Sequence, residues 1–151
     1  MKIRKARVVD IPPISKLILN TIQELNAKDY RKRQLEIEKK QHTIGELKKE
    51  IKEKPFFILI DKDKIVGVIQ LDLKENRLDR LFLNPQYIGK GFGKKLIIYV
   101  ENYAKKKGIK KILLYPTDYA LEFYKKTGYK ITKECIGYGG YPVYEMEKEL
   151  K

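Results

Sequence analysis

Three glycines at alternate positions separate a strand pattern from a helix pattern in the middle of the chain. The strand pattern covers residues 78–83, and the helix pattern covers residues 94–107, in which apolar residues recur at helical spacing. The glycines between them are Gly89, Gly91 and Gly93. Glycine lets a backbone approach a ligand closely, and the unpaired N–H groups of a first helical turn point at whatever lies there. The order of strand, glycine loop and helix therefore suits a phosphate or pyrophosphate, although a plain tight turn would use the same glycines.

This glycine pattern differs from the two common nucleotide-binding fingerprints. Lys95 occupies the position at which a P-loop carries Ser or Thr, so the stretch is not a P-loop. A Rossmann loop opens the first βαβ unit, whereas the segments before this loop have the pattern of antiparallel hairpins. The sequence therefore predicts a phosphate-binding loop of another kind.

Length, charge and cysteine content bound the rest of the prediction. The chain has 151 residues, of which 42% are hydrophobic, and we expect one domain, residues 1–151, with its own core. The formal net charge of +14 favours an anionic partner, which is a nucleic acid, a membrane surface or a phosphorylated cofactor. The only cysteine excludes an intrachain disulfide and suits a reducing compartment. Because no apolar run has the length of a membrane span and no signal sequence is visible, we expect a cytoplasmic protein without membrane contact.

Before the glycine loop, one strand pattern is followed by helix patterns and then by three more strand patterns. Residues 3–9 have a strand pattern, and Asp10 marks the start of a helix with prolines in its first turn. Residues 30–41 are mostly charged and predict a solvated helix or a mobile segment. Thr43 and Glu46 have the spacing of a capping box, which predicts another short helix. An antiparallel meander of three strands is then expected over residues 56–60, 65–73 and 78–83.

After the loop, the chain returns to the sheet. We expect a strand over residues 111–115, a helix over residues 117–127, and two closing strands over residues 129–136 and 142–150. The helix between the strands at 78–83 and 111–115 makes a βαβ crossover, so those two strands must be parallel. The predicted fold class is α/β, with a mixed, mainly antiparallel central sheet flanked by helices.

Four segments, taken in order, resemble the GCN5-related N-acetyltransferase (GNAT) superfamily over nearly the whole chain. Residues 3–12 resemble the first strand and helix of the family, and residues 81–93 resemble its acetyl-CoA motif, Arg/Gln-x-x-Gly-x-Gly/Ala. In residues 120–129 a Phe-Tyr pair precedes Gly and an aromatic residue, as in a later family motif, and residues 144–150 resemble the closing strand. The resemblance implies a GNAT-like sheet with a βαβ acetyl-CoA-binding unit. It implies transfer of an acetyl group from acetyl-CoA to a primary amine, on a small molecule or a protein, by direct attack in a ternary complex without a metal. Homodimers are common in the family, so the resemblance also admits a homodimer.

The resemblance further implies site residues. Tyr124 is the general acid that protonates the departing thiolate, and Asp79 is the first choice for the base that takes a proton from the amine. Glu75 is the second choice, and an ordinary turn or surface charge remains the alternative for both carboxylates. Ile88 stands where the family motif has Arg or Gln, and Thr117 stands where many members have Asn. We therefore expect the backbone of the loop to hold the pyrophosphate, and the strand before it to hold the pantetheine arm. The expected cofactor-binding residues are Leu81, Phe82, Leu83, Ile88, Gly89, Lys90, Gly91, Phe92, Gly93, Lys94, Thr117 and Tyr124.

Other conspicuous residues have ordinary explanations that we prefer. His42 abuts a predicted helix cap, Cys135 is expected to be a buried thiol, and residues 30–33 are expected to form a solvated basic face. The loop of residues 138–144 either lines an acceptor pocket or closes a hairpin. No Cys/His cluster in the sequence supports a metal site.

The competing class of function is a binding module without catalysis. A nucleic-acid-binding protein would use the net charge and the tyrosines. However, the basic residues are spread through every segment instead of forming one stripe, so we expect no nucleic-acid partner. The other form of this hypothesis is an acetyltransferase fold that binds acyl-CoA as a sensor. The departure from the family motif at Ile88 is its only supporting observation.

Overall fold

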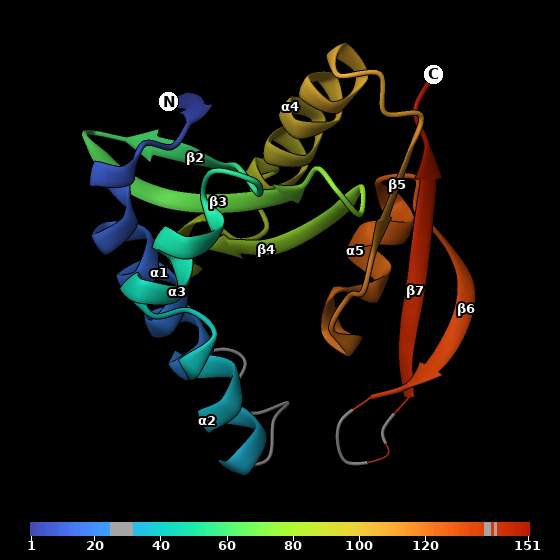
Figure 1. The fold of residues 1–151 in the computed structure, drawn as a ribbon, viewed down its shortest axis with the longest axis horizontal. Coiled ribbons are helices and arrows are strands. Elements are labelled where there is room, and N and C mark those ends of the chain that lie inside the picture. The colour runs from blue at the N-terminus through green and yellow to red at the C-terminus, as the bar shows by residue number, and fades with distance from the viewer. Residues whose placement is uncertain (25–31, 138–139, 141) are drawn as a thin grey trace.

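A seven-stranded mixed sheet forms the centre of the protein (Figure 1). The computed structural model describes residues 1–24, 32–137, 140 and 142–151. The strands lie in the order β1-β2-β3-β4-β5-β7-β6 and are antiparallel to their neighbours, except that β4 and β5 are parallel. Their bounds are β1 Lys2–Lys5, β2 Phe56–Asp61, β3 Lys64–Asp72, β4 Arg77–Leu83, β5 Lys111–Leu114, β6 Lys130–Ile136 and β7 Pro142–Glu149. This arrangement confirms the predicted fold class, including the antiparallel meander and the parallel crossover.

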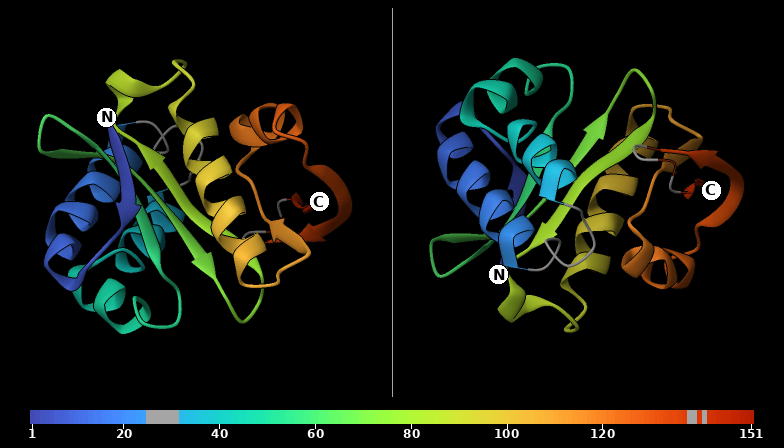
Figure 2. Two further views of the ribbon diagram at one scale, coloured as in Figure 1. Left: turned by 90° about the horizontal axis from the view of Figure 1, so that it is seen from above. Right: turned by 90° about the horizontal axis from the view of Figure 1, so that it is seen from below.

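Helices cover both faces of the first half of the sheet (Figure 2). The helices are α1 Ile11–Glu24, α2 Lys32–Lys40, α3 Ile44–Glu50, α4 Phe92–Lys106 and α5 Leu121–Lys126. Alternate residues of β2 face opposite ways: Phe56 and Ile58 pack against α1 and α3, whereas Phe57 and Leu59 pack in the cluster that contains α4. A strand that is buried on both faces has a continuous apolar sequence, which is why apolar and polar residues do not alternate over residues 56–60.

A hairpin turn and a helix cap agree with the sequence. Lys62 and Asp63 have φ values of 49° and 64°, as a two-residue hairpin turn between β2 and β3 requires. Thr43 caps α3 by accepting a hydrogen bond from the N–H of Glu46 at 3.3 Å. Residues 32–40 form the solvated helix that was one of the two predictions for residues 30–41, and Tyr30 and Arg31 lie outside the described residues.

The strand predicted over residues 3–9 is wrong beyond Lys5. Asp10 accepts a hydrogen bond from the N–H of Arg7 at 2.7 Å and two from the guanidinium of Arg4 at 2.8 and 3.0 Å. This carboxylate folds residues 8–10 into a 3-10 turn, which leaves the apolar Val8 and Val9 exposed. The same residue sets the start of α1, as predicted. The helix predicted over residues 117–127 is likewise divided, into a 3-10 turn at Asp118–Ala120 followed by α5.

A second buried carboxylate joins α4 to β7 and to the segment between α5 and β6. Glu101 of α4 accepts hydrogen bonds from the hydroxyl of Tyr129 at 2.9 Å and from Nζ of Lys148 at 3.1 Å. Burial and the charge of Glu101 raise the pKa of Tyr129, so the phenol stays protonated and donates. Among the described helices, none is long and apolar enough to cross a bilayer.

Replacing Asp10 with Asn is expected to lower the free energy of unfolding by ~2 kcal/mol at pH 7, because charged hydrogen bonds to Arg4 and the Arg7 N–H are lost. The hydrogen bond from Arg4 holds the pKa of Asp10 below its ordinary value, which exceeds the opposing effect of burial. A lowered folded pKa stabilises the protein above the unfolded value of about 3.9 and loses that stabilisation as pH falls through the folded pKa. Urea unfolding should therefore separate wild type from Asp10→Asn at pH 7 but much less at pH 2.5.

Asp63→Asn, in the exposed hairpin turn, is the matched control and should change stability by less than about 0.5 kcal/mol at either pH. An equal loss for both variants would contradict the role given to Asp10.

Candidate active site

The parallel strands β4 and β5 separate soon after they meet. Arg77 and Leu113 form the one paired position between these two strands, both of which lie wholly in the described part of the chain. The N–H of Leu113 donates to the carbonyl of Asn76 at 3.0 Å, at the start of β4. Beyond this point β4 continues to Leu83 while paired only with β3. The backbone edge of β4 that faces β5 is therefore open over the residues that lead into the glycine loop.

A bulge in β4 begins three residues beyond the position paired with β5. Val68 of β3 faces Phe82 and Gln70 faces Asp79, so two residues of β4, Arg80 and Leu81, lie opposite the single residue Ile69. Arg80 has a φ of 50°, in the left-handed region. Such a bulge bends the strand and increases its twist. Beyond the bulge, Phe82 and Leu83 pair with β3 again in a register that is shifted by one residue.

The three glycines have two different structural roles. Gly89 and Gly91 have φ values of 79° and 88°, and a Cβ added at either position would meet nothing within 4 Å. Gly91 is the N-cap of α4, which begins at Phe92, earlier than the apolar pattern indicated. Gly93 lies inside the helix, where a Cβ would come within 3.0 Å of Cζ of Phe123. Two glycines thus leave an open loop in front of a helix N-terminus, and the third lets α4 and α5 pack closely.

Tyr124 is packed where β4, α4 and α5 meet. It is 9% exposed, and its ring contacts those of Phe123 and Tyr129 at centroid distances of 5.2 and 5.9 Å. Phe123 in turn lies against Gly93, beside Leu83 at the end of β4. The structure therefore brings the predicted acid, the strand end and the start of the loop helix into one apolar cluster.

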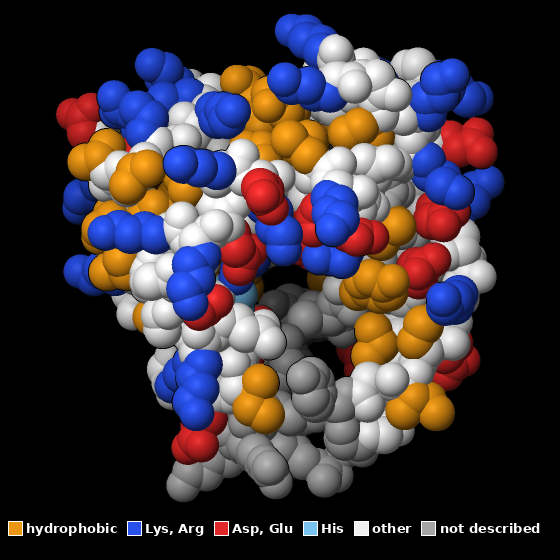
Figure 3. All heavy atoms as spheres, viewed as in Figure 1, with side chains coloured by type: hydrophobic (Ala, Val, Ile, Leu, Met, Phe, Trp, Pro, Cys, Tyr) orange, Lys and Arg blue, Asp and Glu red, His pale blue; other side chains and the backbone are white. Residues whose placement is uncertain are grey.

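A cavity of about 340 Å³ opens beside β4 on the side of α2 and α3. The space-filling view shows this face hollowed at its centre, with acidic and basic side chains around the hollow (Figure 3). Polar residues from three elements and the adjoining loops line the cavity: Glu38, Gln41, His42, Glu46, Glu50, Lys54, Arg77, Asp79 and Arg80. A larger hollow of about 670 Å³ lies at the C-terminal end of α4 and along β7, away from the glycine loop.

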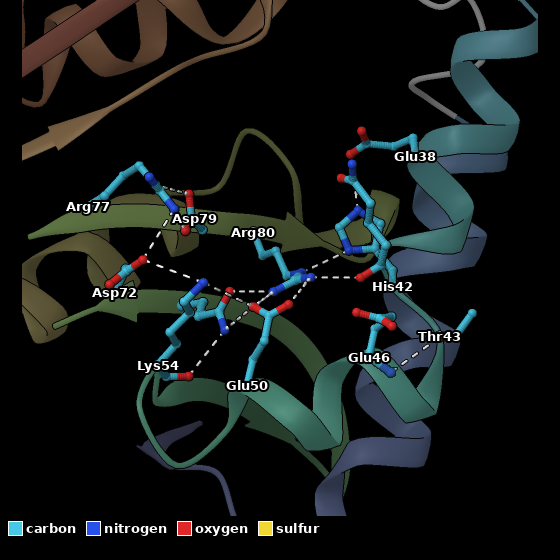
Figure 4. A network of polar contacts seen from close by, with 12 residues as sticks. Glu38, His42, Thr43, Glu46, Glu50, Lys54, Asp72, Arg77, Asp79 and Arg80 are labelled. Atoms are coloured by element: carbon cyan, nitrogen blue, oxygen red, sulfur yellow. Dashed lines mark hydrogen bonds and ion pairs between the residues drawn. The ribbon is translucent and has the colours of Figure 1, made fainter. Parts of the chain in front are cut away.

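Arg80 organises the wall of the smaller cavity (Figure 4). Its Nε donates to Nδ1 of His42 at 2.9 Å, and Nη1 donates to Glu50 at 2.7 Å and to Oε1 of Gln70 at 2.6 Å. Nη2 donates to the carbonyl of Gln41 at 2.7 Å and to Glu50 at 3.1 Å. Burial raises the pKa of Glu50, but Arg80, Gln70 and nearby Lys54 outweigh it, so that this pKa lies below its ordinary value. The Arg80–Glu50 pair is therefore ionised at neutral pH.

His42 is part of this wall, which the sequence did not indicate. It is 3% exposed, and because Arg80 is always a donor, Nδ1 must be the acceptor and Nε2 must carry the proton. Nε2 lies 3.0 Å from Glu38, and the backbone carbonyl of His42 accepts from Ser15 of α1 at 2.6 Å. The i, i+4 spacing of Glu38 and His42 was the one available signal for this contact.

The two candidate bases lie in different surroundings. Asp79 lines the cavity, and both of its oxygens accept from Nε of Arg77, at 2.9 and 3.2 Å. Arg77 also donates to Asp72 at 3.2 Å, so it bridges two carboxylates. Glu75 is exposed in the turn between β3 and β4. The structure thus brings Asp79, but not Glu75, to the cavity wall.

The remaining predicted site residues lie along the open edge and the loop. Ile88, Lys90 and Lys94 are exposed, and Thr117 precedes the 3-10 turn that leads into α5. Cys135 is only partly buried on the edge strand β6, so the expected buried thiol is wrong. Within the ranges that the structure describes, no group of His, Cys, Asp and Glu could hold a metal ion.

Comparison with known proteins finds one family model and many related structures. Residues 26–150 match the model of the acetyltransferase (GNAT) domain. Spermidine N(1)-acetyltransferase of Thermoplasma acidophilum is 36% identical over 72 residues, which are 44% of this chain and 45% of that protein. The chain spans about half the length of the curated relatives that it matches.

Two solved structures match nearly the whole chain. The PaiA N-acetyltransferase of T. acidophilum, solved in complex with coenzyme A, has a TM-score of 0.84 and 26% identity over 98% of each chain. A GCN5-related N-acetyltransferase of Rhodopseudomonas palustris has a TM-score of 0.87 and 23% identity, over 99% of this chain and 95% of that one. With the open β4 edge, the glycine loop and the family match taken together, this chain belongs to the GNAT acetyltransferase domain family.

Proposed function

We propose that the protein is an N-acetyltransferase that transfers the acetyl group of acetyl-CoA to a primary amine, on a small molecule or a protein, by direct attack in a ternary complex. The observation that carries this proposal is the open edge of β4 directly before a glycine loop and a helix N-terminus. Membership of the GNAT family and the coenzyme A bound to the PaiA structure support it.

The loop residues have the features that a pyrophosphate needs. The first hydrogen bond across the start of α4 runs from the N–H of Lys95 to the carbonyl of Gly91, so the N–H groups of Phe92, Gly93 and Lys94 precede it and have no carbonyl one turn earlier. Gly89 and Gly91 leave open space in front of them. The helix dipole and the neighbouring lysines favour an anion at this point. We propose that these groups hold the pyrophosphate and that backbone groups of residues 81–83 hold the pantetheine arm.

The chemistry requires two proton transfers. When bound, acetyl-CoA supplies an activated thioester. A C–N bond forms as the amine attacks the thioester carbonyl, and the C–S bond breaks. The hydroxyl of Tyr124 donates its proton to the departing thiolate, and Asp79 accepts the proton of the amine, directly or through water. Tyr124 lies in the cluster at the end of β4 and Asp79 lies on the cavity wall, which is consistent with an acid and a base on different sides of the open strand edge.

Calorimetric titration with acetyl-CoA, and separately with a short DNA duplex at physiological salt, tests the proposal. We expect saturable binding of acetyl-CoA and no comparable binding of the duplex. Gly91→Ala should weaken acetyl-CoA binding at least about tenfold, because the added Cβ projects into the space that the pyrophosphate would fill.

Gly108→Ala is the matched control, since Gly108 has a φ of 83°, nothing within 4 Å of its added Cβ, and a place at the other end of α4. Both variants should lose ~1 kcal/mol of stability from left-handed strain, but only Gly91→Ala should lose affinity. Salt-sensitive duplex binding without acetyl-CoA binding would overturn the proposal in favour of a nucleic-acid-binding module.

Tyr124→Phe is expected to lower kcat about 100-fold while leaving the Kd for acetyl-CoA unchanged, because only proton donation is removed. Release of free thiol is followed with a panel of amines that includes spermidine, an aminoglycoside and a lysine-containing peptide. Tyr115→Phe, an exposed tyrosine whose hydroxyl donates to Glu145, is the control and should retain full activity. If Tyr124→Phe were as active as wild type, Tyr124 would not be the acid.

Asp79→Asn is expected to lower kcat at pH 7 about tenfold or more, and the deficit should shrink as pH approaches 10. An alkylamine with a pKa of about 10 is mostly ammonium at neutral pH and loses its proton without help only near that value. Glu75→Gln, in the exposed turn, provides the comparison. A deficit that is independent of pH, or that appears in Glu75→Gln instead, would remove Asp79 from this role.

A further inference from the structure

Arg80 holds a strained backbone in the middle of a strand. Among the described non-glycine residues with positive φ, Lys62, Asp63 and Asn76 lie in turns, whereas Arg80 lies within β4. A left-handed conformation costs a residue with a Cβ ~1–2 kcal/mol. Strain of this kind persists only when the surrounding structure holds it in place.

The side chain of Arg80 supplies that restraint. A guanidinium has five N–H groups, and the five hydrogen bonds that Arg80 makes use one at Nε, two at Nη1 and two at Nη2. The side chain is 10% exposed, and the guanidinium lies 5.8 Å from the ring centroid of Phe56. A lysine could neither fill these five directions nor match the planar geometry of Glu50.

The acceptors come from separate parts of the fold. Glu50 belongs to α3, Gln70 to β3, and Gln41 and His42 to the segment between α2 and α3. The backbone carbonyl of His42 accepts a hydrogen bond from Ser15 of α1, and its ring contacts Glu38 of α2. Arg80 therefore ties the bulge of β4 to every helix on that face of the sheet.

We propose that Arg80 is a positioning residue that sets the course of residues 81–83 by anchoring the left-handed bulge from which they continue. This rests on the proposed function, in which those residues hold the pantetheine arm. β5 ends at Leu114, one residue beyond the position paired with Arg77, so residues 81–83 run past the end of β5 and take their direction from the bulge. Without the anchor, a residue with a Cβ would leave the left-handed conformation, and residues 81–83 would change direction relative to the open edge.

The test compares Arg80→Ala with Arg80→Gly by calorimetric titration with acetyl-CoA. Both variants remove all five hydrogen bonds, but glycine adopts positive φ without strain. Arg80→Ala should bind acetyl-CoA about tenfold more weakly, which corresponds to ~1.4 kcal/mol, and Arg80→Gly should stay within about threefold of wild type. Equal losses of acetyl-CoA affinity in both variants, or no loss in either, would overturn the proposal. If Arg80 supplied only its hydrogen bonds, Arg80→Gly would not bind acetyl-CoA better than Arg80→Ala.

Lys133, an exposed residue in β6 without positive φ, gives the matched control pair. Lys133→Gly should be less stable than Lys133→Ala, as in any strand interior, and neither variant should alter acetyl-CoA binding. Glu50→Gln provides a second route if Arg80→Ala does not fold. It should weaken acetyl-CoA binding in the wild-type chain but not in the Arg80→Gly background, because its effect passes through Arg80. An undiminished effect in that background would contradict the proposal.

Amide hydrogen exchange separates this proposal from the function on which it rests. In the ligand-free protein, Arg80→Ala should speed exchange at residues 78–83 as the strained bulge loosens the ladder with β3, and Arg80→Gly should do so much less. If wild type fails to bind acetyl-CoA but the two variants differ in this way, the proposed function is wrong and the role of Arg80 stands. If wild type binds acetyl-CoA and the two variants exchange alike, the role of Arg80 is wrong.

Discussion

The single pairing of β4 with β5 is the constraint on which the rest of the structure depends. A sheet that is joined at one position, Arg77 with Leu113, would bend or separate there without support from another layer. Helix α4 provides that support. Its buried face lies in one cluster with Phe57 and Leu59 of β2 and with Ile112 and Leu114 of β5. Apolar packing across the gap therefore replaces the backbone hydrogen bonds that the open edge lacks.

A polar contact strengthens the same junction from the outer half of the sheet. Glu101 of α4 accepts hydrogen bonds from Tyr129 and Lys148, two residues that follow β5 in the sequence. The amine of Lys148 also donates to the carbonyl of Thr127 at the end of α5 at 2.8 Å. Because α5 carries Tyr124, the group proposed as acid is fixed relative to α4 by contacts that do not involve the open edge itself.

Local signals in the sequence predicted most of the fold. Glycine, proline and capping residues mark turns through φ values and hydrogen bonds that depend on neighbours, so the hairpin at Lys62 and the cap at Thr43 were predicted correctly. The end of β1 was missed because a carboxylate several residues later, Asp10, decides it. The predicted glycine loop was also local, because it is contiguous and its open space follows from two residues with positive φ.

The features that the sequence did not reveal depend on distant contacts. Arg80 meets partners that are 10, 30, 38 and 39 positions away, and no spacing rule on a strand indicates a bulge. His42 looked like a residue beside a helix cap, because its contact with Arg80 exists only once α2 and α3 pack beside β4. Gly93 looked like part of the loop, although the ring of Phe123 is the reason that no Cβ fits there.

The distribution of charge indicates which part of the site gives specificity. The buried acidic groups, such as Asp10, Asp72 and Glu101, are paired with Arg or Lys, which leaves the surplus of +14 mostly on exposed lysines. Figure 3 shows Lys and Arg side chains scattered over the described part of this face, not gathered in one patch. Scattered exposed charges are screened beyond ~8 Å at physiological salt and attract any anion alike. The N–H groups at the start of α4, by contrast, are fixed in direction by the helix and adjoin the open space beside Gly89 and Gly91. We infer that the lysines speed encounter with a phosphorylated ligand and that the backbone geometry selects it.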